Sequence, residues 1–175
     1  FEGQEVARNT RVEAGAGISY PILRSEGGEL TVGGDLVYFG YQRNLRFFTL
    51  GHGGYYSPQS FFAANIPVDY RGRAGDFTYR LGGTAGFAVW RENPSDVFPN
   101  NRFLQNQLIA AAAQDATNTL ITRYPGQSQQ NFIAGLRGNI DYAITPRINI
   151  GAGFQYDKSA NWDETVVQLR LQGRF

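Results

Sequence analysis

The sequence predicts an all-β protein, specifically a transmembrane antiparallel β-barrel with about seven strands in this chain. Its segments alternate apolar and polar residues with a period of two, which is typical of strands whose two faces differ. Tight turns alternate with longer connections along the chain. Aromatic residues gather towards both ends of the segments, where a membrane strand meets the two interfaces.

The predicted strands cover residues 10–23, 29–42, 59–71, 76–91, 130–144, 147–157 and 164–175. Each can cross a bilayer when tilted, because a transmembrane strand needs about 9–11 residues. In chain order, the apolar sides carry Val12, Ala14, Ile18 and Ile22; Leu30, Val32, Leu36 and Tyr38; Phe62, Ile66, Val68 and Tyr70; Phe77, Leu81, Phe87 and Val89; Phe132, Leu136, Ile140 and Tyr142; Ile148, Ile150 and Phe154; and Val167, Leu169 and Leu171.

The connections differ in length on the two sides of the predicted sheet. Tight turns are expected at 24–29, 72–76 and 145–147, and longer loops at 43–58, 93–129 and 158–163. Outer-membrane barrels have short periplasmic turns and long extracellular loops, so we place the long connections outside the cell.

The longest connection, residues 93–129, is predicted to form an extracellular insert with a short helix. Asn100 or Asn101 can cap the first turn of this helix. One face would carry Phe103, Leu104, Leu108 and Ala111. We expect the helix to cover the mouth of a pore, either as a gate or as a passive lid.

Composition excludes several classes of protein. The chain has 175 residues, of which 42% are apolar, and a net charge of +1. No run of about 18 apolar residues is present, which excludes transmembrane helices. The near-zero charge argues against a nucleic-acid partner. The absence of cysteine excludes disulfides and thiolate metal sites.

A water-soluble sandwich or a lipocalin-like barrel is the alternative fold, since either would also show alternation. Two features weigh against it. Aromatic residues cluster at both segment ends, as in interfacial girdles. The polar face carries charged residues at mid-strand, which a water-filled interior tolerates.

The end of the chain suggests that these strands belong to a larger barrel. The last segment alternates up to Phe175, which resembles the assembly signal of outer-membrane barrels and would lie at the periplasmic rim. Single-chain bacterial barrels have even strand numbers. We therefore expect at least one strand before residue 1, and residues 1–175 to be a single domain in the C-terminal part of the barrel.

Residues 51–70, GHGGYYSPQSFFAANIPVDY, carry a distinctive motif. Its matching positions are Gly53, Gly54, Tyr55, Tyr56, Ser57, Pro58 and Gln59, followed by Ile66, Pro67 and Val68. The motif resembles the C-terminal domain of the outer-membrane cellulose export proteins, the cellulose synthase operon protein C family. Residues 75–87 and the terminal VVQLRLQGRF also fit, whereas the 93–129 insert departs from the family pattern.

The resemblance implies a barrel of about sixteen strands behind a periplasmic tetratricopeptide-repeat scaffold. It also implies export of cellulose made by an inner-membrane synthase complex. From the residues alone, the glycines at 51, 53 and 54 permit positive φ angles. The motif is then either a well-packed extracellular loop or part of the pore lining.

The polar face is predicted to line the pore. Its candidate pore-lining residues are Arg11, Glu13, Asp35, Phe39, Tyr41, Asp69, Arg71, Arg80, Trp90, Arg137, Asp141, Asp157 and Arg170. Arginines and acids are nearly balanced, whereas a pore for an anionic polymer should be dominated by basic residues. Balance suits a neutral, hydroxyl-rich chain, and Phe39, Tyr41, Phe61 and Trp90 could guide it. The alternatives are that these rings anchor loops and that the charges satisfy one another.

These observations lead to an expected function. We expect an outer-membrane channel that exports cellulose or a related neutral β-1,4-glucan, contacts membrane lipid, and needs no catalytic residue, cofactor or metal. A general diffusion porin is the alternative with the same architecture. An outer-membrane enzyme using His52, the only histidine, is the alternative from another class.

Overall fold

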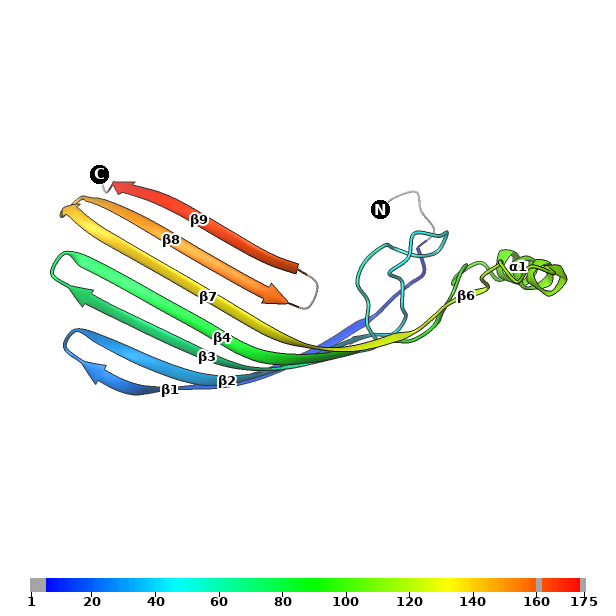
Figure 1. Cartoon of the computed structure of the whole chain (residues 1–175), viewed down its shortest axis with the longest axis horizontal. Helices are drawn as coiled ribbons and strands as arrows, with labels where there is room; N and C mark the ends of the chain where they lie inside the picture. The colour runs from blue at the N-terminus through cyan, green and yellow to red at the C-terminus, as the bar shows by residue number, and fades with distance from the viewer. Residues whose placement is uncertain (1–5, 160–161, 174–175) are drawn as a thin grey trace. The chain divides into compact units, whose positions relative to one another are not determined.

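A computed structural model describes residues 6–159 and 162–173. Seven strands form one sheet in the order β1-β2-β3-β4-β7-β8-β9 (Figure 1). They are β1 (Arg11–Ser25), β2 (Gly28–Tyr41), β3 (Ser60–Ala74), β4 (Phe77–Glu92), β7 (Gln127–Thr145), β8 (Ile148–Ser159) and β9 (Trp162–Gly173). Each long strand lies beside the next one in the chain, and β1 and β9 are the edges. The prediction of an all-β chain with seven strands is confirmed.

Strands β7, β8 and β9 pair antiparallel. Asn139 lies opposite Gly153, and Gly153 lies opposite Gln168. A register shift interrupts the β7–β8 pairing between Ala143 and Thr145. Phe175, expected at the periplasmic rim, falls outside the described residues.

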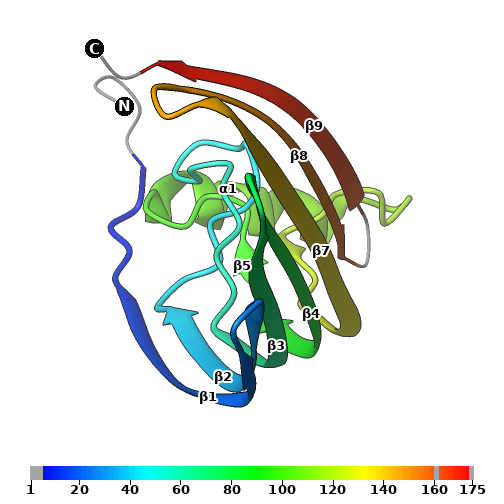
Figure 2. The ribbon, with the colours of Figure 1, turned by 90° about the vertical axis from the view of Figure 1, so that its left-hand side faces the viewer.

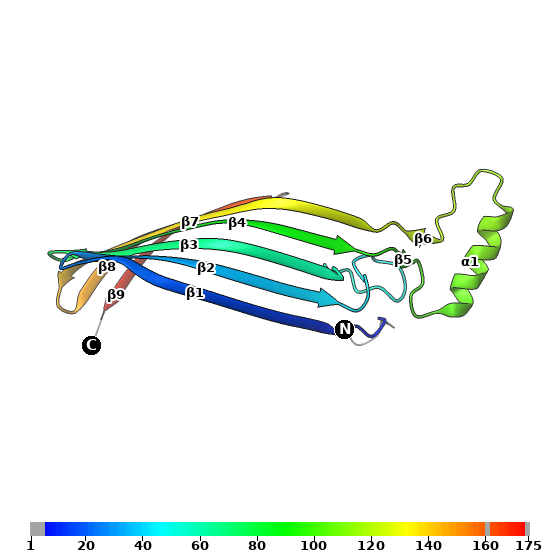
Figure 3. The same cartoon turned by 90° about the horizontal axis from the view of Figure 1, so that it is seen from below.

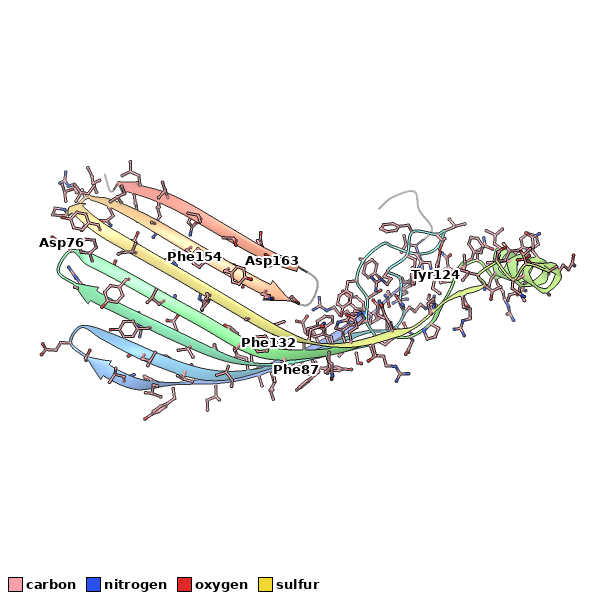
Figure 4. All side chains as sticks on the ribbon, in the orientation of Figure 1. Asp76, Phe87, Tyr124, Phe132, Phe154 and Asp163 are labelled. Carbon is pink, nitrogen blue, oxygen red and sulfur yellow. The ribbon has the colours of Figure 1, made fainter. Side chains whose placement is uncertain are left out.

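The expected loop at 158–163 is wrong. β8 continues to Ser159 and β9 begins at Trp162, so Lys158 is paired with Asp163. Figure 4 labels Asp163 near the start of β9. Polar side chains at the end of an exposed hairpin do not prevent the backbone ladder from continuing. Composition alone therefore placed the end of β8 too early.

Short turns join three of the strand pairs, as the spacing predicts. Gly75, between β3 and β4, has a φ of 57°, a value that favours glycine. After β7, the Thr145 hydroxyl oxygen accepts hydrogen bonds from the backbone N–H groups of Arg147 and Ile148 at 3.2 and 3.1 Å. These contacts hold the turn that leads into β8.

Backbone contacts divide the chain into two compact units. The loop unit comprises Phe1–Ala14, Tyr38–Phe62 and Val89–Gln129. The sheet unit comprises Gly15–Val37, Ala63–Ala88 and Gln130–Phe175. The three tight turns belong to the sheet unit, and both long connections belong to the loop unit.

The sheet unit leaves its apolar face exposed. Ala63 and Ala88 are the only buried apolar side chains among its described residues. By contrast Ile18 is 78% exposed and Leu169 is 84% exposed. Other exposed members of this face are Tyr20, Ile22, Leu36, Ile66, Phe87, Phe132, Leu136, Phe154, Val167 and Leu171. The strands of this unit follow a curved path from β1 to β9 (Figure 2).

The loop unit has a small core of its own. Leu45 is fully buried, and Val97 and Ala7 lie nearly so. A short two-stranded sheet, β5 (Ser95–Asp96) with β6 (Arg123–Tyr124), was not predicted. Within this unit, β5 and β6 precede and follow a helix, α1 (Figure 3).

Helix α1 (Arg102–Gln114) forms inside the insert where the sequence predicts one, and the Asn101 side chain caps it by accepting from the Leu104 N–H at 3.0 Å. The predicted packing face is partly wrong, because Phe103 is 69% exposed. Buried Gln105 instead accepts from the Phe98 N–H and donates to the Thr122 carbonyl. These hydrogen bonds place Gln105, and not the whole predicted apolar face, against the rest of the loop unit. No helix in the described ranges is long and apolar enough to cross a membrane.

Candidate functional site

The polar face of the sheet unit carries charges that meet across strands. Asp69 on β3 accepts from the Arg80 Nε on β4 at 2.8 and 3.0 Å. Arg137 on β7 lies 3.7 Å from the same carboxylate. Three predicted pore-lining residues from three neighbouring strands therefore share one ion-pair cluster.

A second cluster joins strands that are not neighbours. Asp141 on β7 is bound by the Arg170 guanidinium on β9 at 2.5 and 2.7 Å. Between them, on β8, lies Gly151, which is the register partner of both residues. The pair can form only because the middle strand presents no side chain at this point.

Other glycines on this face also leave room for the side chains of neighbouring strands. A Cβ atom on Gly151 or Gly82 would lie within 3.0 Å of the Asp141 and Arg137 side chains respectively. At Gly153, a Cβ atom would meet Asn139 from one side and Gln168 from the other. The long polar side chains therefore pass over glycines of the adjacent strand.

Three further predicted pore-lining charges, Arg71, Asp157 and Asp35, have identified neighbours in the structure. The Arg71 guanidinium pairs with the Glu29 carboxylate at 2.7 Å, and the same carboxylate pairs with Arg24 at 2.9 Å. Glu29 was not among the predicted pore-lining residues. Asp157 accepts from the Gln155 amide, and the Asp35 carboxylate lies over the backbone of Gly17. Exposed ion pairs contribute about 0–1 kcal/mol each, so these pairs order the face more than they stabilise it.

Three of the predicted rings form an aromatic cluster in the loop unit, and the predicted Arg11 lies over it. The rings of Phe39 and Phe61 stack at 4.5 Å with an interplanar angle of 17°. Tyr41 meets Phe39 edge-on at 6.3 Å. The Arg11 guanidinium lies 4.5 Å above the Phe39 ring and also pairs with Glu13 at 2.7 Å. Apolar ring surface and a charged donor are thus presented side by side.

Trp90 makes a separate contact. Its ring meets the Tyr56 ring edge-on at 5.4 Å. Burial raises the pKa of the Tyr56 phenol, and the nearby Glu92 carboxylate adds to this effect. Tyr56 therefore remains a neutral phenol at physiological pH.

The motif at residues 53–59 holds the loop unit together. Ser57 is fully buried, and its hydroxyl accepts from the Leu45 N–H at 2.7 Å. Gly54 has a φ of 67°, and its N–H donates to the Leu45 carbonyl. The Gln59 side chain accepts from the Asn93 N–H at 2.6 Å. These contacts favour a packed loop over the pore-lining role that the sequence left open.

Buried polar groups complete this scaffold. Glu92 accepts from the Arg46 guanidinium at 2.7 Å and from the Gln127 amide at 2.6 Å, which joins three chain segments. His52 is buried, with Nε2 at 2.9 Å from the Asp96 carbonyl and its ring edge-on to Phe47. This environment matches a structural histidine.

Beyond α1, Asp115 organises a turn. Its carboxylate accepts from the side chain and N–H of Thr117 and from the N–H groups of Thr119 and Leu120. These hydrogen bonds, led by the Thr117 hydroxyl, hold the pKa of Asp115 below its usual range. Within residues 6–159 and 162–173, no three acidic or histidine side chains gather to hold a metal ion.

Comparison with known proteins identifies the family. The whole chain, residues 1–175, matches the family described as the C-terminus of cellulose synthase operon protein C. The chain belongs to this family. The resemblance drawn from the 53–59 motif is confirmed.

Relatives of the cellulose synthase operon protein C family cover nearly all of this chain. It is 35% identical to cellulose synthase operon protein C of Komagataeibacter xylinus, over 93% of this chain and 13% of the relative. It is 37% identical to cellulose synthase 2 operon protein C of the same organism, over 93% of this chain and 12% of the relative. For the Salmonella typhimurium relative the identity is 27%, over 98% of this chain and 14% of the relative. The chain thus spans about an eighth of these proteins' length.

The glycines of the polar face provide a first prediction. Replacing Gly82 by alanine should push the flexible Arg137 side chain away from Asp69 and cost up to about 1 kcal/mol, the usual range for an exposed ion pair. Gly83 is the matched control, because a Cβ atom there meets only ordinary contacts at 3.5 Å or more. Urea unfolding in lipid vesicles measures both variants. Equal stability of the two variants would contradict the role of Gly82.

Proposed function

We propose that this chain is the C-terminal part of an outer-membrane β-barrel that conducts cellulose, or a related neutral β-1,4-glucan, to the cell surface. The observation that carries the proposal is the contrast between the two faces of the sheet unit. One face is apolar and exposed, and the other carries paired charges and polar side chains. The relatives' names add the link to a cellulose synthase operon.

Lipid is the cover that best fits the apolar face. Soluble monomers rarely expose apolar patches larger than a few hundred Å². Here apolar side chains from Ile18 on β1 to Leu171 on β9 are exposed along the sheet. Hydrocarbon tails would bury them without any further protein layer.

Closure of a barrel would require strands from elsewhere in the protein. β1 and β9 are edges of the sheet in this chain, and an open edge is not tolerated inside a membrane. The chain spans about an eighth of its relatives, so further strands have room in the full-length protein. A barrel of about sixteen strands would meet this need.

The polar face suits a neutral polymer. Asp69 and Asp141 are each neutralised by arginines, so the face offers hydrogen-bond donors and acceptors without a dominant charge. The aromatic cluster of Phe39, Tyr41 and Phe61 offers ring surface for the C–H faces of sugars. A general diffusion porin would use the same polar lining but has no need of these rings.

The remaining parts of the system lie outside this chain. A periplasmic repeat scaffold and an inner-membrane synthase complex would deliver the glucan, and this domain would catalyse no reaction. The insert with α1 would cover the outer mouth. No cofactor is part of this proposal.

A matched pair of substitutions tests the lipid assignment. Leu169 and Gln168 are neighbours on β9 and lie on opposite faces. Leu169→Arg should destabilise the membrane-inserted protein by about 2–4 kcal/mol, the cost of arginine on the lipid face near the midplane. Gln168→Arg should change stability by less than about 1 kcal/mol, because an exposed polar position gains only a surface charge. Unfolding in vesicles measures the difference, and equal costs would exclude lipid contact at Leu169.

The aromatic cluster tests the polymer assignment. Replacing Phe39 and Phe61 by alanine should reduce extracellular glucan several-fold while the protein remains folded in the outer membrane. Tyr38→Ala, on the opposite face of β2, should secrete normally. Secreted polymer is quantified alongside uptake of small solutes. Normal secretion in the double variant would contradict guidance, and altered uptake with unchanged polymer on gene deletion would indicate a porin.

A further inference from the structure

The loop unit contains two adjoining hollows, both lined by Asp96 of β5 and Arg123 of β6, and the larger one is also lined by residues of α1. The larger has a volume of about 660 Å³ and the smaller about 320 Å³. Both fall within the usual size of ligand sites, about 300–1,000 Å³. They share Arg43, Asp96, Pro99 and Arg123, so they form the two halves of one groove.

We propose that this groove is a binding site for a short segment of neutral glucan on the extracellular side of the domain. This inference rests on the proposed export function and adds a second contact point for the polymer. The first is the aromatic cluster, whose Phe61 follows the groove residue Gln59 by two positions on the chain.

The lining chemistry matches a hydroxyl-rich ligand. Guanidinium groups of Arg102 and Arg123 and the amide of Asn106 supply hydrogen-bond donors. The Asp96 carboxylate supplies acceptors and is about half-exposed. Sugar hydroxyls both donate and accept, so they need this mixture. Phe98 and Ile109 supply apolar surface for the C–H faces of a pyranose ring.

The position of Asp96 argues against an anionic ligand. Its carboxylate belongs to both halves of the groove and pairs with the Arg123 Nε at 2.9 Å. A site built for phosphate or carboxylate would not place an acid at its centre. The three arginines of the wall can donate hydrogen bonds to the hydroxyl oxygens of a sugar.

The walls are held before any ligand arrives. Buried Gln105 joins α1 to the Phe98 N–H at 3.0 Å and to the Thr122 carbonyl at 2.8 Å. On the other side, Thr49 donates to the Val97 carbonyl at 2.7 Å, and His52 meets the Asp96 carbonyl at 2.9 Å. A preformed groove loses less conformational entropy on binding. The buried His52 thereby acquires a role as a support for the groove wall.

The test is calorimetric titration of cellohexaose into the full-length protein in detergent. It is made in a Phe39→Ala/Phe61→Ala background, so that the aromatic cluster does not mask the groove. Adding Arg102→Ala and Asn106→Ala should weaken binding at least tenfold. Gln107→Ala, exposed on α1 and outside the groove, is the matched control and should bind as the background does.

Asp96→Asn is a second variant that keeps the size of the side chain, for the case in which the double variant fails to fold. It should weaken binding several-fold. Unchanged cellohexaose affinity in folded groove variants would overturn the inference, and so would the absence of binding in the background protein. Tighter binding of hexagalacturonate than of cellohexaose would overturn the assignment to a neutral ligand.

Failure of the groove is distinguishable from failure of the export proposal. If the groove variants bind and secrete as the parent does, while deletion of the gene abolishes extracellular glucan, only the groove inference falls. If deletion leaves extracellular glucan unchanged, the export function itself falls.

Discussion

The period of two along each strand is the constraint on which this structure depends. It separates Leu169 from Gln168 and sends their side chains to opposite faces of the sheet. Since Ala63 and Ala88 are the only buried apolar side chains of the described sheet unit, the apolar face gains no protein cover there. The hydrophobic effect therefore favours covering this face with an apolar environment from outside the chain. Lipid is the environment that our proposal supplies.

On the polar face, glycines allow charged side chains of different strands to meet. Asp141 and Arg170 stand on strands separated by β8, and only the missing side chain of Gly151 lets them meet. Arg137 crosses Gly82 in the same way towards Asp69. Charges are thus neutralised along the sheet, and large groups are kept close to its surface. Under the proposed export function, such a polar and nearly neutral lining would suit a neutral polymer.

Much of the fold was predictable because alternation is a local property. The pattern of Leu30 to Tyr38 identified β2. The choice of Asn100 or Asn101 as the cap located the start of α1, which Asn101 caps. The continuation of β8 to Ser159 was missed, since ladder pairing overrides the polar composition of a hairpin end. The face of α1 was only partly predicted, because the two hydrogen bonds of Gln105 depend on distant segments.

The candidate site was only partly predictable. Parity placed Asp69, Arg80 and Arg137 on one face, and the structure joins them. The glycines on that face were visible in the sequence, but their role depends on register across three strands. Glu29 was missed as the partner of Arg71 because the match of their strands was unknown. The groove beside α1 depends on long-range packing of the loop unit and left no local signal.

The most direct test uses the absence of cysteine from the chain. Single cysteines are introduced at each position of β8 from Ile148 to Asp157 in a full-length protein whose cysteines outside this chain are replaced by serine, and the protein is spin-labelled and inserted into vesicles. Collision with oxygen and with a water-soluble nickel chelate is then measured. The account predicts period-two alternation, with oxygen contact at even positions such as Ile150 and Phe154 and chelate contact at odd ones such as Asn149 and Gln155. Chelate contact on both faces, or on neither, would contradict the claim that lipid covers the apolar face.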